Sequence, residues 1–348
     1  MPLIGGKRTF LHGLYQLPNV NAGSNALRVA ANAGFHVVHG EPTRASLDAA
    51  AAVGLSRWVT TSAAPDRIRA RVAELAPHRA LLFWETEDEP SYQWNKPGAR
   101  VSPAKIKDAY ALLKKLDPAR AVYLNHSPTN LVSTLQQYNP GGDFLATDIY
   151  PVIPPGIRPQ YALWPDGRQG DLLNNRLSQV GQYMDKLRQV AGPERACLMV
   201  LQAFAWENLR EKDRDAKMVL YPTREELRFM AFHSIVRGAN GLLWWGLQFT
   251  PAAAPLWADL AAVTRELRSL DAALAAPAIA APGRAARLEY HDTGHSLDRG
   301  VECMLKPGPV LLAVNADPNP VDVTFHGLLP GGDPRRQRFA PFGVAVLR

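Results

Sequence analysis

Four acidic residues lie close together in the segment Phe83-Trp-Glu-Thr-Glu-Asp-Glu-Pro90, namely Glu85, Glu87, Asp88 and Glu89. Carboxyl groups that share a site resist ionising together, so the pKa of at least one of them rises and that group can donate a proton near neutral pH. Pro90 restricts the backbone of the residue before it and so fixes the direction of Glu89. The alternative is an acidic loop that only faces water, as charged clusters often do.

Aromatic and polar residues follow the ends of several other apolar segments. Indole rings stack on the C–H faces of pyranose rings, and amides, carboxylates and imidazoles form hydrogen bonds with hydroxyl groups. The mixture therefore suits a carbohydrate better than a phosphate or an apolar ligand. The residues expected to bind it are His12, Glu87, Asp88, Asn125, His126, Tyr150, Gln202, Trp206 and Trp244.

The expected proton donor needs a second carboxylate. Asp148 is preferred because it ends the apolar segment Asp143–Asp148, and Glu207 is the less favoured choice. Asp148 could instead cap a helix or hold Tyr150. A separation of ~6.5–9.5 Å between the carboxyl groups of Glu89 and Asp148 would fit inverting hydrolysis of a glycosidic bond, and ~5–5.5 Å would fit retention.

Other kinds of chemistry lack their motifs. His12, His39 and His126 have neither HxH nor HExxH spacing, so no metal site is expected. The phosphate-binding patterns GxGxxG and GxxxxGK[ST] are absent, as is the serine motif G-x-S-x-G. Cys197 and Cys303 form no CxxC pair. We therefore expect acid/base chemistry without a cofactor.

The elements that would position these residues alternate between short apolar strands and amphipathic helices. This pattern implies parallel strands joined by crossover helices, and eight rounds match the size of a (β/α)8 barrel. A doubly wound sheet is the rival fold, but the glycine-rich turn that would indicate it is missing. The expected strands are Thr9–Leu17, Phe35–His39, Arg57–Thr61, Ala80–Glu85, Ala121–Asn125, Asp143–Asp148, Ala196–Ala203 and Gly241–Trp245.

The last part of the chain has a different periodicity. Short alternating segments at Ala286–Tyr290, Val301–Leu305, Val310–Asn315, Val321–Phe325 and Val344–Leu347 predict a small antiparallel β-sandwich-like domain. We place the barrel at residues 1–274 and this β domain at 283–348. The proline-rich segment Pro151–Gly170 is too long for a simple connection, and such loops are more often functional.

The acidic motif and the strand order resemble retaining glycoside hydrolases of clan A and related barrel families. In that clan the fourth strand ends in Asn-Glu-Pro, and its Glu is the acid/base. Asp88-Glu89-Pro90 stands in this place here, a variant similar to that of β-galactosidase-like barrels, with further likeness in Thr147–Pro151 and Gly238–Trp245. The resemblance implies that Glu89 is the acid/base.

One position departs from the clan pattern. The clan's nucleophile is a Glu at the end of the seventh strand, where this sequence has Gln202, and an amide cannot form the glycosyl ester. Either Glu207 or Asp148 takes over, or hydrolysis is inverting, or activity is lost.

The composition is that of a globular protein, and it indicates neither nucleic acid nor a membrane as a partner. The 348 residues carry a formal net charge of +7, and the basic residues are scattered, so nucleic acid is not an expected partner. No apolar run approaches the ~18–20 residues of a membrane helix, and no signal peptide precedes the first strand. The protein is expected to be secreted or periplasmic if a leader was removed, and otherwise cytoplasmic; the sequence does not fix the oligomeric state.

These features together predict a glycosidase with a carbohydrate substrate, Glu89 as proton donor, and Asp148 or Glu207 as base or nucleophile. A non-catalytic glycan-binding barrel is the main alternative because of Gln202. A polysaccharide lyase that uses the same residues is the second.

Overall fold

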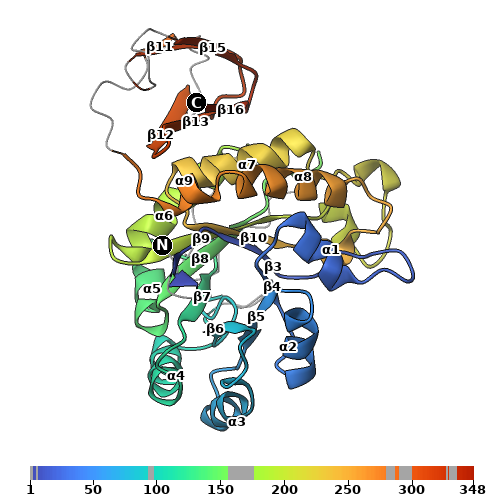
Figure 1. Ribbon diagram of the computed structural model, residues 1–348, viewed down its shortest axis with the longest axis vertical. Coiled ribbons are helices and arrows are strands. Elements are labelled where there is room, and N and C mark those ends of the chain that lie inside the picture. Colours follow the sequence, from blue (N-terminus) through green and yellow to red (C-terminus); the bar gives the residue numbers. More distant parts are fainter. Residues whose placement is uncertain are drawn as a thin grey trace.

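Eight parallel strands close into a barrel in the computed structural model, which describes residues 3–4, 7–92, 98–155, 176–279, 287–289, 300–326, 328 and 335–348 (Figure 1). Each strand pairs with its neighbours in the chain, and the last pairs with the first. The predicted (β/α)8 barrel is confirmed. Its strands are β3 (Leu11–Leu14), β4 (Val37–His39), β5 (Ser56–Thr60), β6 (Leu81–Glu85), β7 (Val122–His126), β8 (Phe144–Ile149), β9 (Ala196–Gln202) and β10 (Gly241–Trp245).

The helices surround this barrel and begin where polar caps predict. Asn25, Thr43 and Ser102 each accept a hydrogen bond from a backbone N–H of the first helical turn. Thr223 and Glu226 form a complete capping box at the start of α7. The helices are α1 (Ala26–Ala33), α2 (Arg44–Ala51), α3 (Pro65–Leu75), α4 (Pro103–Leu116), α5 (Val132–Gln136), α6 (Gln179–Ala191), α7 (Arg224–Val236), α8 (Leu256–Arg268) and α9 (Asp271–Ala275). Short 3-10 turns cover Asn139–Gly141, Trp206–Leu209, Ala216–Met218 and Leu247–Phe249.

Alternation along the strands divides their side chains between two cores. One set fills the barrel and includes Trp58, Phe83, Tyr123, Phe144 and Val200. The other set packs between strands and helices, as in Leu14, Val38, Leu124, Leu201 and Trp244. Both cores are almost fully buried, so the barrel is a packed body and leaves room for a ligand only at its ends.

The chain continues into a C-terminal β module of two three-stranded antiparallel sheets. The first sheet contains β11 (Arg287–Glu289), β14 (Val321–Phe325) and β15 (Arg335–Phe339); the second contains β12 (Val301–Lys306), β13 (Val310–Asn315) and β16 (Val344–Leu347). This confirms the predicted fold class. A separate two-stranded ribbon, β1 (Leu3–Ile4) and β2 (Lys7–Arg8), precedes the barrel.

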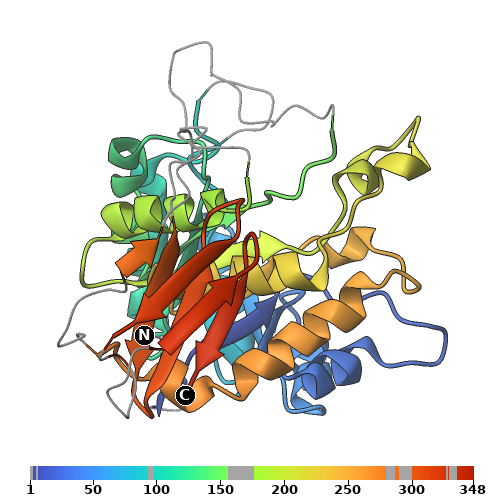
Figure 2. The same ribbon diagram turned by 90° about the horizontal axis from the view of Figure 1, so that it is seen from above.

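Helix α7 lies between the barrel and this module (Figures 1 and 2). Phe229 contacts Phe342 with ring centroids 5.1 Å apart, and Arg228 donates a hydrogen bond of 2.7 Å to the carbonyl of Val344. Arg237, just after the helix, pairs with Glu302 of β12. Apolar and ionic contacts thus both join the module to the barrel.

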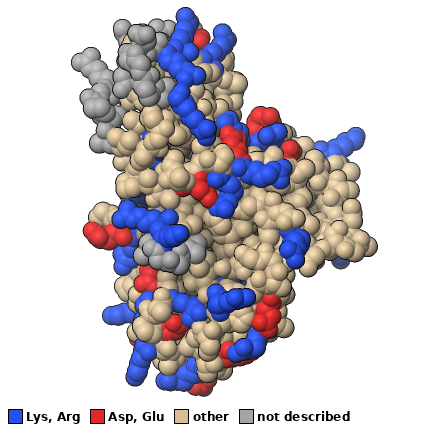
Figure 3. All heavy atoms as spheres, in the orientation of Figure 1, with Lys and Arg blue, Asp and Glu red and all other residues tan. Residues whose placement is uncertain are grey.

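The surface carries charges of both signs. In the face that Figure 3 shows, Lys and Arg side chains are spread over barrel and module, with Asp and Glu between many of them. None of the described helices combines the length and apolar character needed to cross a bilayer.

Candidate active site

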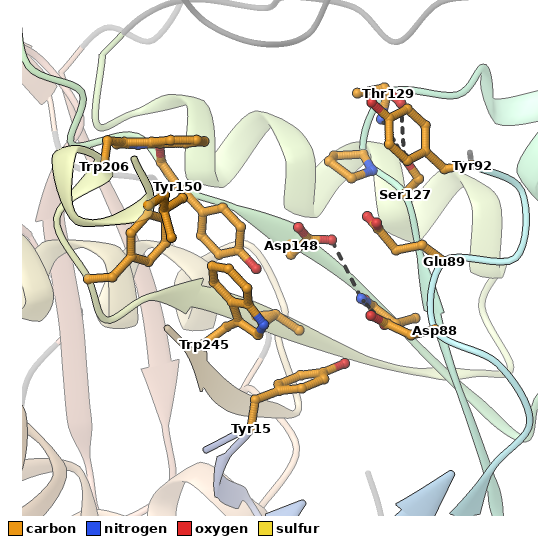
Figure 4. Close-up of a pocket in the computed structure, with 15 residues that line it drawn as sticks. Tyr15, Asp88, Glu89, Tyr92, Ser127, Thr129, Asp148, Tyr150, Trp206 and Trp245 are labelled. Atoms are coloured by element: carbon orange, nitrogen blue, oxygen red, sulfur yellow. Dashed lines mark hydrogen bonds between the residues drawn. The ribbon is translucent and has the colours of Figure 1, made fainter. Parts of the chain in front are cut away.

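A cavity of about 410 Å³ opens at the carboxyl ends of the barrel strands (Figure 4). Its size falls in the range of small-molecule sites, and its position is the one that barrel enzymes use. The residues that line it are Tyr15, Asp88, Glu89, Tyr92, Asn125, Ser127, Pro128, Thr129, Asp148, Tyr150, Val200, Phe204, Trp206, Leu209 and Trp245.

The carboxyl groups of Glu89 and Asp148 face one another in this cavity, near enough for each to change the pKa of the other (Figure 4). Glu89 comes from the loop after β6 and Asp148 from the end of β8. Burial, and then the negative charges of Asp148 and Asp88, raise the pKa of Glu89 well above its ordinary value. Burial also raises the pKa of Asp148, to about 6, although its bond to Glu89 opposes the rise. Near neutral pH the shared proton therefore belongs to Glu89, and Asp148 is mostly ionised.

The backbone of Glu89 is strained. Its φ of 43° lies in the left-handed region, which few residues other than glycine adopt. The chain turns here because Pro90 follows and the N–H of Tyr92 bonds back to the carbonyl of Glu89 at 3.0 Å. This turn carries the side chain of Glu89 toward Asp148, as Figure 4 shows.

Asn125 links two of the acids. Its Nδ2 donates to Oδ1 of Asp88 at 3.0 Å and, more weakly, to Oδ1 of Asp148 at 3.5 Å. The hydroxyl of Tyr15, which also lines the cavity, lies 2.8 Å from that of Tyr123. Burial is the main reason why the pKa of Asp88 is raised, and the bond from Asn125 opposes the rise.

Glu85 lies on the inner face of β6 and is not part of the cavity lining. Its Oε2 accepts hydrogen bonds from Thr60 at 2.7 Å and from Trp58 at 3.3 Å, and the residue is only 1% exposed. Burial and then the charge of Asp88 raise the pKa of Glu85 to about 8. Glu85 is therefore mostly protonated at neutral pH.

An aromatic wall faces the acids. Tyr150 stacks on Trp245 with ring centroids 5.3 Å apart and an interplanar angle of 24°, and Phe204 meets both rings edge-on. Trp206 donates from its indole N–H to the carbonyl of Tyr150 at 3.2 Å. Gly246 has a φ of 105°, and a Cβ there would lie 2.4 Å from Phe204, so glycine is required for this packing.

The sequence-based set of binding residues includes Trp244, but its neighbour Trp245 is the one of the two that lines the cavity. Trp244 belongs to the core between strands and helices, whereas Trp245 lines the cavity. Successive residues of a strand point to opposite faces, so only one of the pair can enter the site. The prediction for Trp244 is corrected accordingly.

Gln202 lies outside the cavity lining, with both ends of its amide engaged. Its Oε1 accepts from the N–H of Val152 at 2.8 Å, and its Nε2 donates to the carbonyls of Val152 and Phe204, both at 3.0 Å. The residue is fully buried. Gln202 thus holds the segment after β8 against the end of β9.

Glu207 also lies away from the cavity lining. It is 1% exposed, and its Oε1 accepts from the backbone N–H of Asp215 at 2.6 Å and from Arg210 at 3.3 Å. These bonds hold the irregular segment between β9 and α7 together.

Three other residues that were expected to bind the carbohydrate do not line the cavity. His12 bonds Asp271 of α9 at 2.9 Å, on the outer side of β3. His126 follows the cavity residue Asn125 and so points to the opposite face of β7. Glu87 accepts a hydrogen bond of 3.0 Å from the N–H of Ala63.

The structure therefore brings together six of the predicted residues, which line one cavity: Asp88, Glu89, Asn125, Asp148, Tyr150 and Trp206. The sequence-based set missed the aromatic residues Tyr15, Tyr92, Phe204 and Trp245 and the segment Ser127–Thr129, all of which line it. Strand alternation could have identified Trp245, and Ser127–Thr129 directly follows a predicted strand end. The predicted loop Pro151–Gly170 lies mostly outside the described residues, and within the described residues no group of three or more His, Cys, Asp or Glu side chains is arranged to hold a metal ion.

Neither the protein-family models nor the curated proteins contain a match to this chain. Solved structures share its fold. A β-galactosidase from the haloarchaeon Halorubrum lacusprofundi aligns with a TM-score of 0.50 at 15% identity, over 76% of this chain and 59% of that one. An FMN-binding β-glucuronidase from Faecalibacterium prausnitzii L2-6 aligns with a TM-score of 0.51 at 12% identity, over 98% of this chain and 52% of that one.

β-Glucuronidase 2 of Bacteroides uniformis, solved in covalent complex with cyclophellitol-6-carboxylate aziridine, aligns with a TM-score of 0.50 at 11% identity, over 98% of this chain and 43% of that one. The chain thus spans about half the length of these enzymes. At such identities the likeness shows a shared fold, a barrel followed by a β module.

Proposed function

We propose that the protein is a glycosidase whose general acid is Glu89 and whose base or nucleophile is Asp148. The observation that carries this proposal is the pair of facing carboxyl groups of Glu89 and Asp148 in a cavity walled by Tyr150, Trp206 and Trp245. The pair combines a carboxyl group that keeps its proton with one that loses it, which is the division of roles that glycoside hydrolysis needs. The glycosidase names of proteins with the same fold support the proposal.

In this proposal the aromatic wall binds the face of a sugar ring, and the acids act at its glycosidic oxygen. Glu89 donates its proton to the leaving oxygen, while Asp148 acts on the anomeric carbon directly or through water. The separation of the two carboxyl groups when substrate is bound decides the stereochemical outcome: ~5–5.5 Å fits retention and ~6.5–9.5 Å fits inversion.

A second candidate is a glycan-binding barrel without catalysis. The bonds that fix Gln202 favour it, because the residue at the end of β9 is committed to holding backbone and offers no carboxylate to the cavity. The two candidates share the aromatic wall and differ in whether Glu89 and Asp148 turn a substrate over.

A panel of aryl glycosides and oligosaccharides tests the proposal. Wild-type protein should release product, and Glu89→Gln should lower kcat by about 10²–10⁴ because a general acid is lost. Asp108→Asn, a change on the exposed side of α4, serves as the control and should keep full activity. Proton NMR of the first product gives the anomeric configuration. Binding of a glycan with no turnover by either protein would favour the second candidate, and ultraviolet-absorbing unsaturated products would show elimination instead.

A further inference from the structure

The cavity holds one more carboxyl group than the proposed chemistry uses. Glu89 and Asp148 carry the reaction, yet Asp88 also lines the cavity. Its carboxylate accepts a hydrogen bond of 3.0 Å from Asn125, which helps to fix its direction. Asp88 is partly buried, and a charge that has lost part of its water is costly unless a partner offsets it.

No basic side chain balances these acids within the lining. Among the described residues around the cavity there is no Lys, Arg or His. The charge of Arg100 acts on Asp88 and Glu89, but this residue is exposed and does not line the cavity. Among the described lining residues a ligand carboxylate would therefore meet negative charges and no positive one, whereas a ligand cation would be attracted by the acids.

The carboxyl oxygens offer acceptors as well. Asp88, Glu89 and Asp148 all line the cavity, and Asn125 donates from its Nδ2 to Oδ1 of Asp88 and, more weakly, to Oδ1 of Asp148. A group with several N–H donors and no acceptor, such as an ammonium, suits a cavity lined by these oxygens.

The aromatic wall suits a cation for a separate reason. Tyrosine and tryptophan rings attract cations at their faces, and Tyr15, Tyr92, Tyr150, Trp206 and Trp245 all line the cavity. Indole and phenol rings also stack on sugars. One cavity can thus bind both the ring and the ammonium group of an amino sugar.

We propose that the substrate is a glycoside of an amino sugar with a free, unacetylated amine, and that Asp88 and the aromatic wall bind its ammonium group. This inference rests on the proposed glycosidase function and specifies its substrate class. It also sets the protein apart from an enzyme that acts on uronides, since a uronide carboxylate would find no counter-charge in the described lining. Asp88 is then a specificity-determining residue that takes no part in proton transfer.

The test compares four aryl glycosides that differ in one substituent, in both anomeric forms: 2-amino-2-deoxy, 2-acetamido, 2-hydroxy and uronide. For wild-type protein kcat/KM should be about 10- to 100-fold higher for the amino sugar than for the hydroxy sugar, the usual worth of a hydrogen bond to a charged group. The uronide should be the poorest substrate.

Asp88→Asn keeps the shape of the side chain and an oxygen that can accept from Asn125. It should lower the preference for the amino sugar, measured as the ratio of kcat/KM for the amino and the hydroxy sugar, to about threefold or less. Both absolute rates can change, because the variant also removes a negative charge beside Glu89. The ratio of kcat/KM for two substrates, measured on one variant, does not depend on the amount of folded protein. Asp108→Asn, which makes the same change on α4, should keep the wild-type ratio.

Three outcomes separate the two proposals. Turnover of the hydroxy sugar at the same rate as the amino sugar would overturn the inference and leave the glycosidase intact. Calorimetric binding of glucosamine but not glucose, without turnover of any glycoside, would refute the glycosidase and support the binding of the ammonium. Neither binding nor turnover of any sugar on the panel would overturn both.

Discussion

Replacing Glu85 with glutamine should make the stability of the protein less sensitive to pH. Glu85 is buried inside the barrel next to Thr60 and Trp58, and its pKa is raised from 4.5 to about 8. Glutamine is neutral at every pH and can accept the same two hydrogen bonds through its carbonyl oxygen. Its amide group occupies the position of Oε1, which has no partner among the described residues.

The magnitude follows from the raised pKa. Below about pH 4.5 the carboxyl group of Glu85 is protonated in the folded and the unfolded chain alike, so Glu85 does not lower the free energy of unfolding there. As the pH rises, the unfolded chain releases the proton while the folded protein keeps it, so folded stability falls until the pH passes about 8. At 1.36 kcal/mol per pH unit, the loss between pH 5 and pH 8 is about 3 kcal/mol for this one group.

Urea unfolding at pH 5 and pH 8 measures the effect as a difference between two proteins. The wild type should lose about 3 kcal/mol more than Glu85→Gln over this interval. Glu74→Gln, at a half-exposed site on α3, should follow the wild type. Parallel stability curves for wild type and Glu85→Gln would show that Glu85 does not keep its proton in the folded state, and the reasoning would fail.

Three further predictions concern the site and its supports. Wild-type kcat/KM should fall as the pH drops below about 6, where Asp148 becomes protonated. Asp148→Asn should lower kcat by about 10²–10⁴ and abolish this fall at acidic pH in a pH–rate profile. Gln202→Glu should cost about 2–4 kcal/mol in urea unfolding without a gain in rate, because a carboxylate would face two backbone carbonyls that the amide now bonds. Gly246→Ala should lower the thermal midpoint more than Gly23→Ala does: both glycines have positive φ, but only the first would press a Cβ against Phe204.

The barrel could be predicted because its signals are local. Strand alternation, helix caps such as the Thr223–Glu226 box, and glycines that end helices, such as Gly34 after α1, all act within a few residues of chain. Strand β15 escaped prediction because its sequence, Arg-Arg-Gln-Arg-Phe, has a single apolar residue, and the strand forms by pairing with β14. Whether 274 and 283 bound the two domains stays a prediction, since residues 280–286 lie outside the described residues.

The site could be predicted only in part, because side-chain direction and long-range hydrogen bonds decide it. Strand order put Glu89 and Asp148 at the same end of the barrel, and the structure shows that their carboxyl groups face one another in one cavity. Gln202 and Glu207 stand at similar positions in the chain, yet both bond to backbone that the sequence does not place beside them. Which residues of a strand end reach a cavity depends on such partners.

The position of α7 has a practical consequence for anyone who wishes to study the barrel by itself. If the chain were cut after α9, Phe229 would lose the cover of Phe342, and Arg237 would lose one of its two anionic partners, Glu302, and keep Asp185. Such a fragment would display apolar side chains to water and tend to aggregate. A shortened protein that proved inactive would therefore give no information on its catalytic carboxyl groups, and mutagenesis is best done on the full chain.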